Sequence, residues 1–192
     1  PDRLNGFVWF EGARRIEVLS DMLEKPATFV TWYGAALTCQ QLHKRLPTEA
    51  EWEFAARGVD RRIYPWGNQR PSCDWVRYGS PSFMLTLCKT NTEGGLPVRR
   101  AITRDVTPNG VYDLGGNVAE WVANPFVDRF PICAAGPCPD YDAASSDQWG
   151  PASYRSYRGG SWHTEPTALR AASRGRARSD DYNGELGFRC AR

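Results

Sequence analysis

The sequence predicts an α+β domain with little regular secondary structure, and three observations support this fold class. Two stretches of helix formers occur between residues 33 and 57. Beyond residue 58, glycine and proline recur so often that only short strands fit between them. Six cysteines without any CxxC spacing favour disulfide bonds over a zinc site. The 192 residues suit one domain, 1–192, of ordinary globular composition.

Both predicted helices lie in the first third of the chain. The first covers residues 33–43, where apolar side chains recur near helical spacing. The second covers Glu49–Arg57 and has stronger local signals. Thr48 is a good N-cap, and Glu51 three residues later completes a capping box. Gly58 is a plausible C-cap, so this helix is predicted to end at Arg57.

Short strands are the only regular elements predicted after the second helix. Alternating or apolar residues between turn signals indicate four of them, at Gly110–Leu114, Tyr157–Trp162, Leu169–Ser173 and Gly187–Ala191. The segment Pro125–Pro151 is predicted to be a loop-like insertion. The expected structure is a few helices on a small twisted sheet, held together by aromatic side chains and disulfides.

Cysteine spacing alone leaves the disulfide pairing open, since six cysteines can pair in fifteen ways. Pairing by loop closure would give three bridges: Cys39–Cys190, Cys73–Cys88 and Cys133–Cys138. If all three form, the protein belongs in an oxidising compartment. The expected location is therefore extracytoplasmic, which means secreted, periplasmic or at the cell surface.

The charge pattern argues against nucleic acid as a partner. The formal net charge is +2, which is too small to imply nucleic-acid binding. Four arginines gather near the end of the chain without the aromatic residues of an RNA-binding signature: Arg170, Arg174, Arg176 and Arg178. We interpret this cluster as a solvated or salt-bridged face. No run of apolar residues is long enough to predict a membrane span.

Six short sequence motifs, separated along the chain, resemble those of one protein family. They are RLPTEAEWEFAARG (45–58), YPWGN (64–68), NGVYDLGGNVAEWV (109–122), YRGGSW (157–162), LRAASR (169–174) and LGFRCAR (186–192). In this order they resemble the formylglycine-generating enzyme family, also called the sulfatase-modifying factor family. The resemblance runs from about Pro26 to the end and implies a C-type-lectin-like fold with a polar groove. Residues 1–25 are unmatched, so the family's N-terminal segment is expected to be missing or diverged.

The resemblance does not settle the activity, because the family includes copper oxidases, iron enzymes and binding proteins. The oxidases convert a sulfatase cysteine to formylglycine, and two cysteines shortly after the GGS triplet hold their copper. Soft thiolate ligands are what Cu(I) requires. Here Thr164 stands about where the first cysteine would be, and no cysteine lies between Cys138 and Cys190. We therefore expect no copper and no formylglycine-generating activity.

The resemblance also implies a structural calcium site in the phrase DLGGNVAE. Its ligands would be the side chains of Asp113 and Glu120 and the carbonyls of Gly116 and Val118. Hard oxygen donors of mixed side-chain and backbone origin suit calcium. The alternative is that the two carboxylates only cap turns. The resemblance further supports the Cys39–Cys190 bridge, because the family pairs a first-helix cysteine with the one in GFRC.

The leading functional hypothesis is a non-catalytic module that binds a protein or glycan ligand. Aromatic, arginine and adaptable polar side chains are typical of recognition surfaces. The groove would present eleven such residues: Trp162, His163, Thr164, Glu165, Arg174, Arg176, Arg178, Asp180, Asp181, Tyr182 and Asn183. A third possibility is a structural domain within a larger parent assembly.

The alternative hypothesis is an enzyme of the same family that uses neither copper nor cysteine. His163 and Glu165 could act as an acid/base pair, since both residue types can titrate near neutrality. An iron site is not expected, because His43 and His163 are the two histidines of the sequence and they are not predicted to converge. Arg170 and Arg189 are expected to be structural, in buried ion pairs.

Overall fold

The computed structural model describes residues 25–79, 88, 104–128 and 153–192, together with the backbone of three strands nearer the N-terminus. These strands are β1 (Arg3–Leu4), β2 (Phe7–Phe10) and β3 (Arg15–Val18). They form an antiparallel sheet in the order β1-β2-β3.

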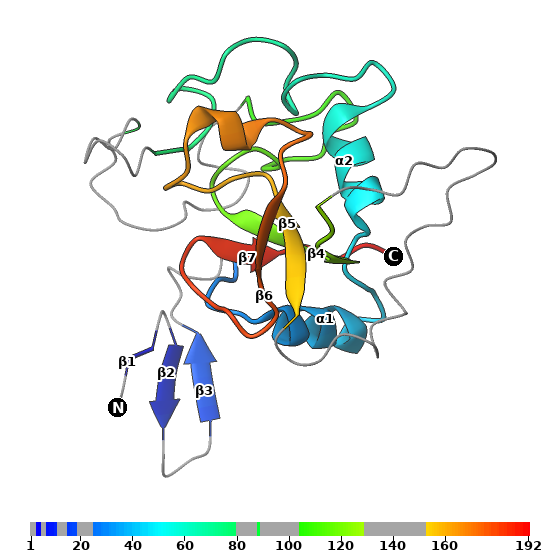
Figure 1. The fold of residues 1–192 in the computed structure, drawn as a ribbon. Helices are drawn as coiled ribbons and strands as arrows, with labels where there is room; N and C mark the ends of the chain where they lie inside the picture. The colour runs from blue at the N-terminus through cyan, green and yellow to red at the C-terminus, as the bar shows by residue number, and fades with distance from the viewer. Residues whose placement is uncertain are drawn as a thin grey trace, which may run out of the picture.

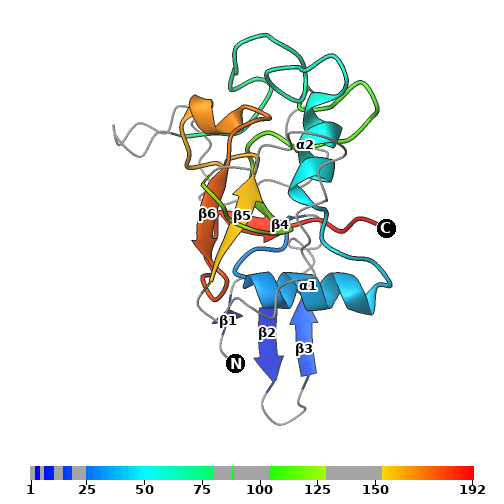
Figure 2. The ribbon, with the colours of Figure 1, turned by 45° about the vertical axis from the view of Figure 1, so that its right-hand side comes forward.

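The second sheet has four strands and forms the centre of the described structure. Its strands are β4 (Ala119–Pro125), β5 (Tyr154–Arg158), β6 (Gly175–Arg178) and β7 (Leu186–Phe188). The order is β6-β5-β4-β7, with β4 and β7 parallel and the other neighbours antiparallel. Figures 1 and 2 show helix α1 across one end of this sheet and helix α2 beside it.

The two helices form close to where the sequence predicts them. Helix α1 (Trp32–Gln41) ends slightly before the predicted boundary. Helix α2 (Glu49–Arg57) has the predicted bounds, and the predicted capping box is present. The Thr48 hydroxyl accepts the Glu51 N–H at 3.2 Å, and a Glu51 carboxylate oxygen accepts the Thr48 N–H at 2.8 Å. Gly58 follows with φ of 63°, as a C-cap requires.

Two of the predicted strands are wrong, and the other two are shifted. The predicted strand Tyr157–Trp162 overlaps only the end of β5, which stops at Arg158, and Gly187–Ala191 extends beyond β7, which stops at Phe188. Residues 169–173 are not a strand: Leu169 ends a 3-10 helix (η5, Pro166–Leu169), and a turn follows it. The nearest strand is β6, which begins after this segment at Gly175. Gly110–Leu114 forms only an isolated bridge between Val106 and Tyr112. The strand β4 was not predicted, although it is the central strand that pairs with both β5 and β7.

The core lies between the central sheet and the two helices. Trp121 on β4 is fully buried and packs with Cys39 of α1 and Leu186 of β7. Trp52 of α2 packs against Leu114 in a second cluster. Because β4 carries side chains into both clusters, the strand holds the two helices at fixed positions relative to the loops that follow β5 and β6.

Two of the three expected disulfides are confirmed. Cys39–Cys190 ties α1 to the end of the chain, and Cys73–Cys88 closes a shorter loop. Cys133 and Cys138 lie outside the described residues, as does most of the Pro125–Pro151 insertion. In the part of the chain that the structure describes, no helix combines the length and hydrophobicity needed to cross a bilayer.

Candidate functional site

The loop after β5 positions the first part of the groove. Gly159 and Gly160 adopt φ angles of 95° and 69°, and a Cβ at Gly160 would lie 2.8 Å from the Thr164 hydroxyl. That hydroxyl accepts the Ser161 N–H at 2.7 Å and donates to the Ser161 carbonyl at 3.1 Å. Thr164 therefore closes a tight turn with its side chain, and it does not present its hydroxyl as a free ligand-binding group.

Glu185 is the carboxylate that meets the groove histidine. One of its oxygens lies 3.0 Å from Nδ1 of His163, and the other accepts a hydrogen bond from the Ser161 hydroxyl at 3.0 Å. The His163 side chain is 49% exposed. The predicted partner of His163 was Glu165, and this is corrected: Glu165 precedes η5 as its N-cap residue, and the carboxylate facing the imidazole belongs to Glu185.

Trp162 links the same loop to residues 181–185. Its indole N–H donates to the carbonyl of Gly184 at 3.2 Å, and its ring lies beside the imidazole of His163 with centroids 5.3 Å apart. The residue is half-buried. One edge of the indole is therefore fixed by the backbone, while part of its surface remains accessible to a ligand.

The predicted groove residues of the 181–185 loop divide into two roles. Asp181 accepts the Arg178 N–H at 2.8 Å, and the Asn183 side chain accepts the Glu185 N–H at 2.9 Å. These two side chains stabilise the loop. Tyr182 between them is 64% exposed. The loop thus presents the tyrosine on a backbone that its neighbours hold in place.

Phe29 joins this surface without having been predicted. Its N–H donates to the Asn183 carbonyl at 2.9 Å, and its ring lies against Gly184. The side chain is 45% exposed, and the backbone φ is 55°, a value that bulky residues rarely adopt. The partners of Phe29 lie about 150 residues away in the sequence, so no local signal identifies its place in this surface.

Arg174 is not a groove residue, which corrects the prediction. Its Nε and Nη2 donate to the two carboxylate oxygens of Glu49 at 2.5 and 3.0 Å, and its side chain is 17% exposed. Arg158, with a fully buried side chain, donates to the same carboxylate at 2.7 Å. Burial raises the pKa of Glu49, but the hydrogen bonds and charges of the two arginines outweigh it and lower that pKa below its ordinary value.

Arg176 and Arg178 do face solvent, with 53% and 47% of their side chains exposed. Arg178 donates to the carboxylate of Asp180 at 3.1 Å, so the predicted groove residue Asp180 neutralises its neighbour. Arg176 lies over two aromatic rings. Arg170 was expected in a buried pair and is exposed instead. The arginine cluster of the sequence therefore separates into buried and displayed members.

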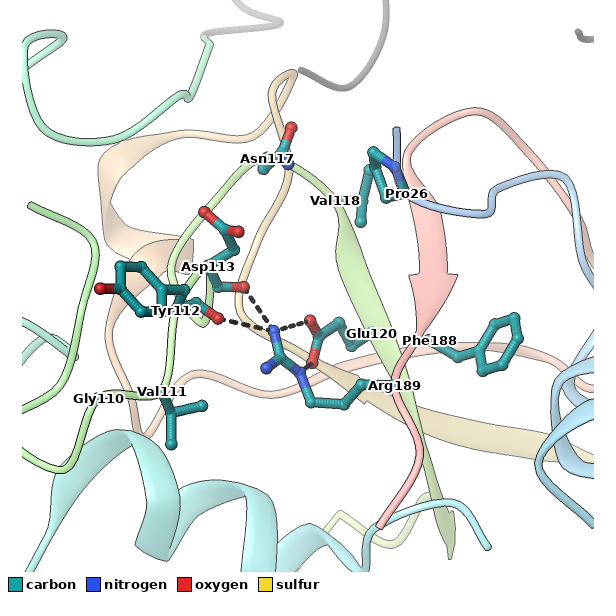
Figure 3. Close-up of a pocket in the computed structure, with 10 residues that line it drawn as sticks. All are labelled: Pro26, Gly110, Val111, Tyr112, Asp113, Asn117, Val118, Glu120, Phe188 and Arg189. Atoms are coloured by element: carbon teal, nitrogen blue, oxygen red, sulfur yellow. Dashed lines mark hydrogen bonds and ion pairs between the residues drawn. The ribbon is translucent and has the colours of Figure 1, made fainter. Parts of the chain in front are cut away.

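A separate cavity of about 430 Å³ lies at the predicted calcium segment (Figure 3). Its lining includes Tyr112, Asp113, Glu120, Phe188 and Arg189. The Arg189 Nη2 donates to Glu120 Oε1 at 2.6 Å and to the carbonyls of Asp113 and Tyr112 at 2.9 and 3.0 Å. This ion pair confirms the structural role expected of Arg189. None of the groove residues lines this cavity.

A buried carboxyl group, Asp105, lies beside the loop that lines this cavity and accepts the Gly115 N–H at 2.8 Å. Asp105 is buried, and one of its oxygens has no hydrogen-bond partner among the described residues. Burial raises its pKa well above the ordinary value, and the negative charges of Asp113 and Glu120 raise it further, with Arg189 and a backbone N–H opposing. Asp105 therefore favours the neutral form, and Arg189 pairs with Glu120.

The donor set at this loop fits calcium in part. Asp113, Gly116 and Asn117 all have positive φ angles, so the backbone turns repeatedly here. The described residues contain no group of three or more His, Cys, Asp or Glu side chains that could hold a metal, so backbone carbonyls would be needed. Glu120 Oε2 already accepts hydrogen bonds from Arg189 Nε and from the Trp52 indole N–H, both at 2.7 Å. Glu120 is therefore committed to these two donors, and Asp113 lines the cavity beside it.

Comparison with known proteins relates this architecture to one family. The family model of the sulfatase-modifying factor enzyme 1-like domain matches residues 2–192, and so takes in the first 25 residues that the sequence motifs left unmatched. The chain is 32% identical to inactive C-alpha-formylglycine-generating enzyme 2 of Bos taurus, over 95% of the chain and 55% of that protein. It is 34% identical to the formylglycine-generating enzyme of Streptomyces coelicolor, over 94% of the chain and 56% of that protein.

A third relative is a longer protein, the serine/threonine-protein kinase pkn1 of Chlamydia pneumoniae. The identity is 35% over 93% of the chain but only 26% of the kinase. The chain thus spans between about a quarter and about half of the length of these relatives.

Solved structures share the fold. Treponema denticola variable protein 1 has a TM-score of 0.65 at 23% identity, covering 86% of this chain and 70% of that one. PvdO from Pseudomonas aeruginosa has a TM-score of 0.61 at 22% identity, covering 97% of this chain and 68% of that one.

Proposed function

The chain belongs to the family of the sulfatase-modifying factor enzyme 1-like domain, and from this premise we propose that it is a non-catalytic module that binds a protein or glycan ligand. Its scaffold would be C-type-lectin-like and supported by calcium. The observation that carries the proposal is the environment of Thr164. At the position where the family's oxidases hold a thiol, its hydroxyl is committed to a turn with Ser161.

The ligand would bind side chains that are at least partly exposed on β6 and on the segments that carry Phe29, Trp162 and Tyr182. We call this set the display surface and define it by five residues: Phe29, Trp162, His163, Arg176 and Tyr182. Aromatic and arginine side chains on a fixed backbone give large contact areas at low entropic cost. The loops that carry this surface are stabilised by the side-chain hydrogen bonds of Thr164, Asp181 and Asn183 described above.

Calcium would stabilise the scaffold without taking part in binding. Asp113 and the carbonyls of Gly116 and Val118 would hold the ion, and Glu120 would add negative charge while retaining Arg189. A bound divalent cation would balance the carboxylate of Asp113 and fix the turn that leads into β4. The turn in question packs close to the loop after β5, since the Gly116 N–H donates to the Gly159 carbonyl at 2.7 Å.

The proposed location is extracytoplasmic. Two disulfides close loops of very different length in the described residues. Disulfides persist in oxidising compartments and are rare in the cytosol. A secreted, periplasmic or surface-exposed module fits these bonds, and such a location would give the display surface access to external proteins and glycans.

One observation favours a second candidate, an enzyme that uses an acid/base residue. The contact between His163 and Glu185 has the form of an oriented imidazole, with the carboxylate on Nδ1 leaving Nε2 for a substrate. In this version Glu185 takes the role first assigned to Glu165. An enzyme would need these groups in a concave site, whereas the cavity described above is lined by other residues.

A binding experiment tests the proposal. The protein is applied to a glycan array and to a peptide array, beside the double variant Trp162→Ala/Tyr182→Ala. The matched control is Phe54→Ser, which changes an aromatic residue on α2 that is 62% exposed and lies outside the display surface. We expect ligands of the wild type to be retained by the control and lost by the double variant. Equal loss in both, or in neither, would overturn the proposal.

A second measurement separates binding from catalysis. The protein is incubated with Cu(I) and a cysteine-containing sulfatase peptide, and the peptide is examined by mass spectrometry. We expect an unchanged peptide mass. Conversion of the cysteine would show that Thr164 does not prevent oxidase chemistry, and the non-catalytic assignment would then fail. The same readout applied to array ligands with His163→Ala tests the acid/base candidate.

A further inference from the structure

We propose that the outer edge of β6 binds an extended acidic peptide segment of a protein partner, with Arg176 as its anchor. This inference rests on the proposed binding function and names the chemical class of the partner. It follows from two independent features of Arg176: among the described residues its strand pairs with β5 alone, and its guanidinium is oriented by aromatic rings with one long ion pair, to Asp128.

The register of the sheet determines which backbone groups of β6 face outward. The Ser179 N–H donates to the Ser153 carbonyl at 2.8 Å, and Arg155 lies opposite Ala177. Hydrogen-bonded pairs alternate with non-hydrogen-bonded pairs in an antiparallel ladder, so the pair of Ser156 and Arg176 is of the second kind. The N–H and C=O of Arg176 therefore point away from β5.

Two residues further along β6, the outward-facing N–H and C=O of Arg178 already have hydrogen-bond partners. The Arg178 N–H donates to a carboxylate oxygen of Asp181 at 2.8 Å, and the Arg178 carbonyl accepts the Asp181 N–H at 3.0 Å. Nothing comparable occurs at Arg176 within the described ranges, where β6 pairs with β5 alone. One donor and one acceptor of the strand edge thus remain available for an added strand.

The guanidinium of Arg176 is oriented by two rings. Its Cζ lies 5.1 Å from the ring centroid of Tyr154 and 5.3 Å from that of Phe126. Stacking against aromatic faces limits the orientations of the side chain and leaves the in-plane N–H groups to bind a carboxylate. The one ion pair described for it is with Asp128 at 3.6 Å, and that aspartate is 86% exposed. A ligand carboxylate can displace so weakly held a partner.

The neighbouring arginines show why the anchor is Arg176. Arg174 contacts the same Phe126 ring but is committed to Glu49. Arg178 is committed to Asp180. Side chains of an added strand alternate between the two faces of the sheet, so those on the side of Arg176 recur at every second residue. The partner segment is therefore expected to carry Asp or Glu at alternate positions.

Fluorescence anisotropy with a defined probe tests this inference. The probe is a labelled peptide of alternating threonine and glutamate, and the reference probe has glutamine in place of glutamate. We expect saturable binding of the glutamate peptide that weakens with added salt. Arg176→Gln should reduce its affinity by about tenfold, because a charge-assisted bidentate contact is lost. Arg178→Gln should change the affinity by less than about twofold, since its guanidinium already serves Asp180.

Four outcomes would overturn the inference: no saturable binding, equal binding of the glutamine peptide, no effect of Arg176→Gln, or an equal effect of Arg178→Gln. Binding of heparin that depends on Arg176 without binding of the peptide would indicate a sulfated glycan and also contradict it. An unchanged unfolding midpoint of Arg176→Gln verifies that the variant is folded. If array ligands are lost with Trp162→Ala/Tyr182→Ala but kept with Arg176→Gln, the binding function stands and this inference alone fails.

Discussion

The carboxylate of Glu185 lies 3.0 Å from Nδ1 of His163, across 22 residues of intervening chain. Its second oxygen accepts a hydrogen bond from the hydroxyl of Ser161, which is fully buried. Glu185 therefore joins the loop after β5 to the loop before β7, the two segments that present Trp162 and Tyr182.

Replacement of Glu185 by alanine should weaken both stability and ligand binding. The variant loses two hydrogen bonds, one of them to a buried serine hydroxyl, so we expect the free energy of unfolding to fall by about 1–2 kcal/mol. Urea denaturation measures this change. Asp74→Ala, an exposed acidic residue elsewhere, is the matched control and should be close to neutral. Equal destabilisation in the two variants would contradict this role of Glu185.

Replacement of Glu49 by glutamine should destabilise the fold more strongly. It takes their shared carboxylate from the buried guanidinium of Arg158 and the largely buried one of Arg174, while Arg158 keeps its ion pair with Glu53. Breaking a buried ion pair costs about 3–5 kcal/mol, and the remaining pair with Glu53 places the expected loss toward the lower end of that range. Glu51→Gln removes an ion pair with Arg45 whose side chains are nearly half exposed, and it should cost well under that amount. Similar losses in the two variants would refute this ranking.

Acid should destabilise the wild type through the same residue. The pKa of Glu49 is lowered in the folded state, so its stabilising contribution is complete above the unfolded value of about 4.3 and is lost as pH falls through the folded value. The pKa of Glu51 is lowered to about 2, mainly by its hydrogen bonds with Arg45. Stability measured below about pH 4 should therefore fall more steeply in the wild type than in Glu49→Gln. Parallel curves would contradict this origin.

The two disulfides should differ in their effect on stability. Cys39–Cys190 spans 151 residues and Cys73–Cys88 spans 15. In the chain-entropy model, losing the first costs about 5 kcal/mol and losing the second about 3 kcal/mol. Thermal unfolding of the paired alanine variants should therefore show the lower midpoint for Cys39→Ala/Cys190→Ala. The reverse order would show that loop length does not dominate here.

Calcium should raise the thermal midpoint of the wild type. Calorimetry in the presence of calcium or of a chelator measures the shift, which for a ligand at about a hundred times its Kd corresponds to about 2.7 kcal/mol. Asp113→Asn should abolish the shift, while Asp74→Asn, an exposed change elsewhere, should preserve it. A shift that survives in Asp113→Asn would place the ion at another site.

Helix α2 was predictable from sequence because its signals are local. Thr48, Glu51 and Gly58 lie within one short segment, and their hydrogen bonds form between near neighbours. Strand β4 was missed because its residues follow a glycine-rich turn and are almost all buried, without polar alternation. The false strand at 169–173 begins at Leu169, the last residue of the 3-10 helix that starts at Pro166, and the residues after it form a turn.

The candidate site was predictable only in outline. The sequence identified Trp162, His163 and Tyr182 through the family resemblance, but side-chain partners depend on tertiary contacts. Arg174 was assigned to the groove because it is near these residues in sequence, whereas its carboxylate partner lies 125 residues away. Phe29 was missed for the same reason, since its position depends on a backbone bond to Asn183.

Hydrogen exchange with a ligand from the arrays bound tests the central claim most directly. If the display surface is the binding site, amides in residues 160–165 and 181–185 should exchange more slowly in the complex, and the recovered ligand should have an unchanged mass. Slower exchange confined to residues 110–120, around the separate cavity, would contradict the location of the site. A ligand recovered with an altered mass would contradict the claim that the module binds without catalysis.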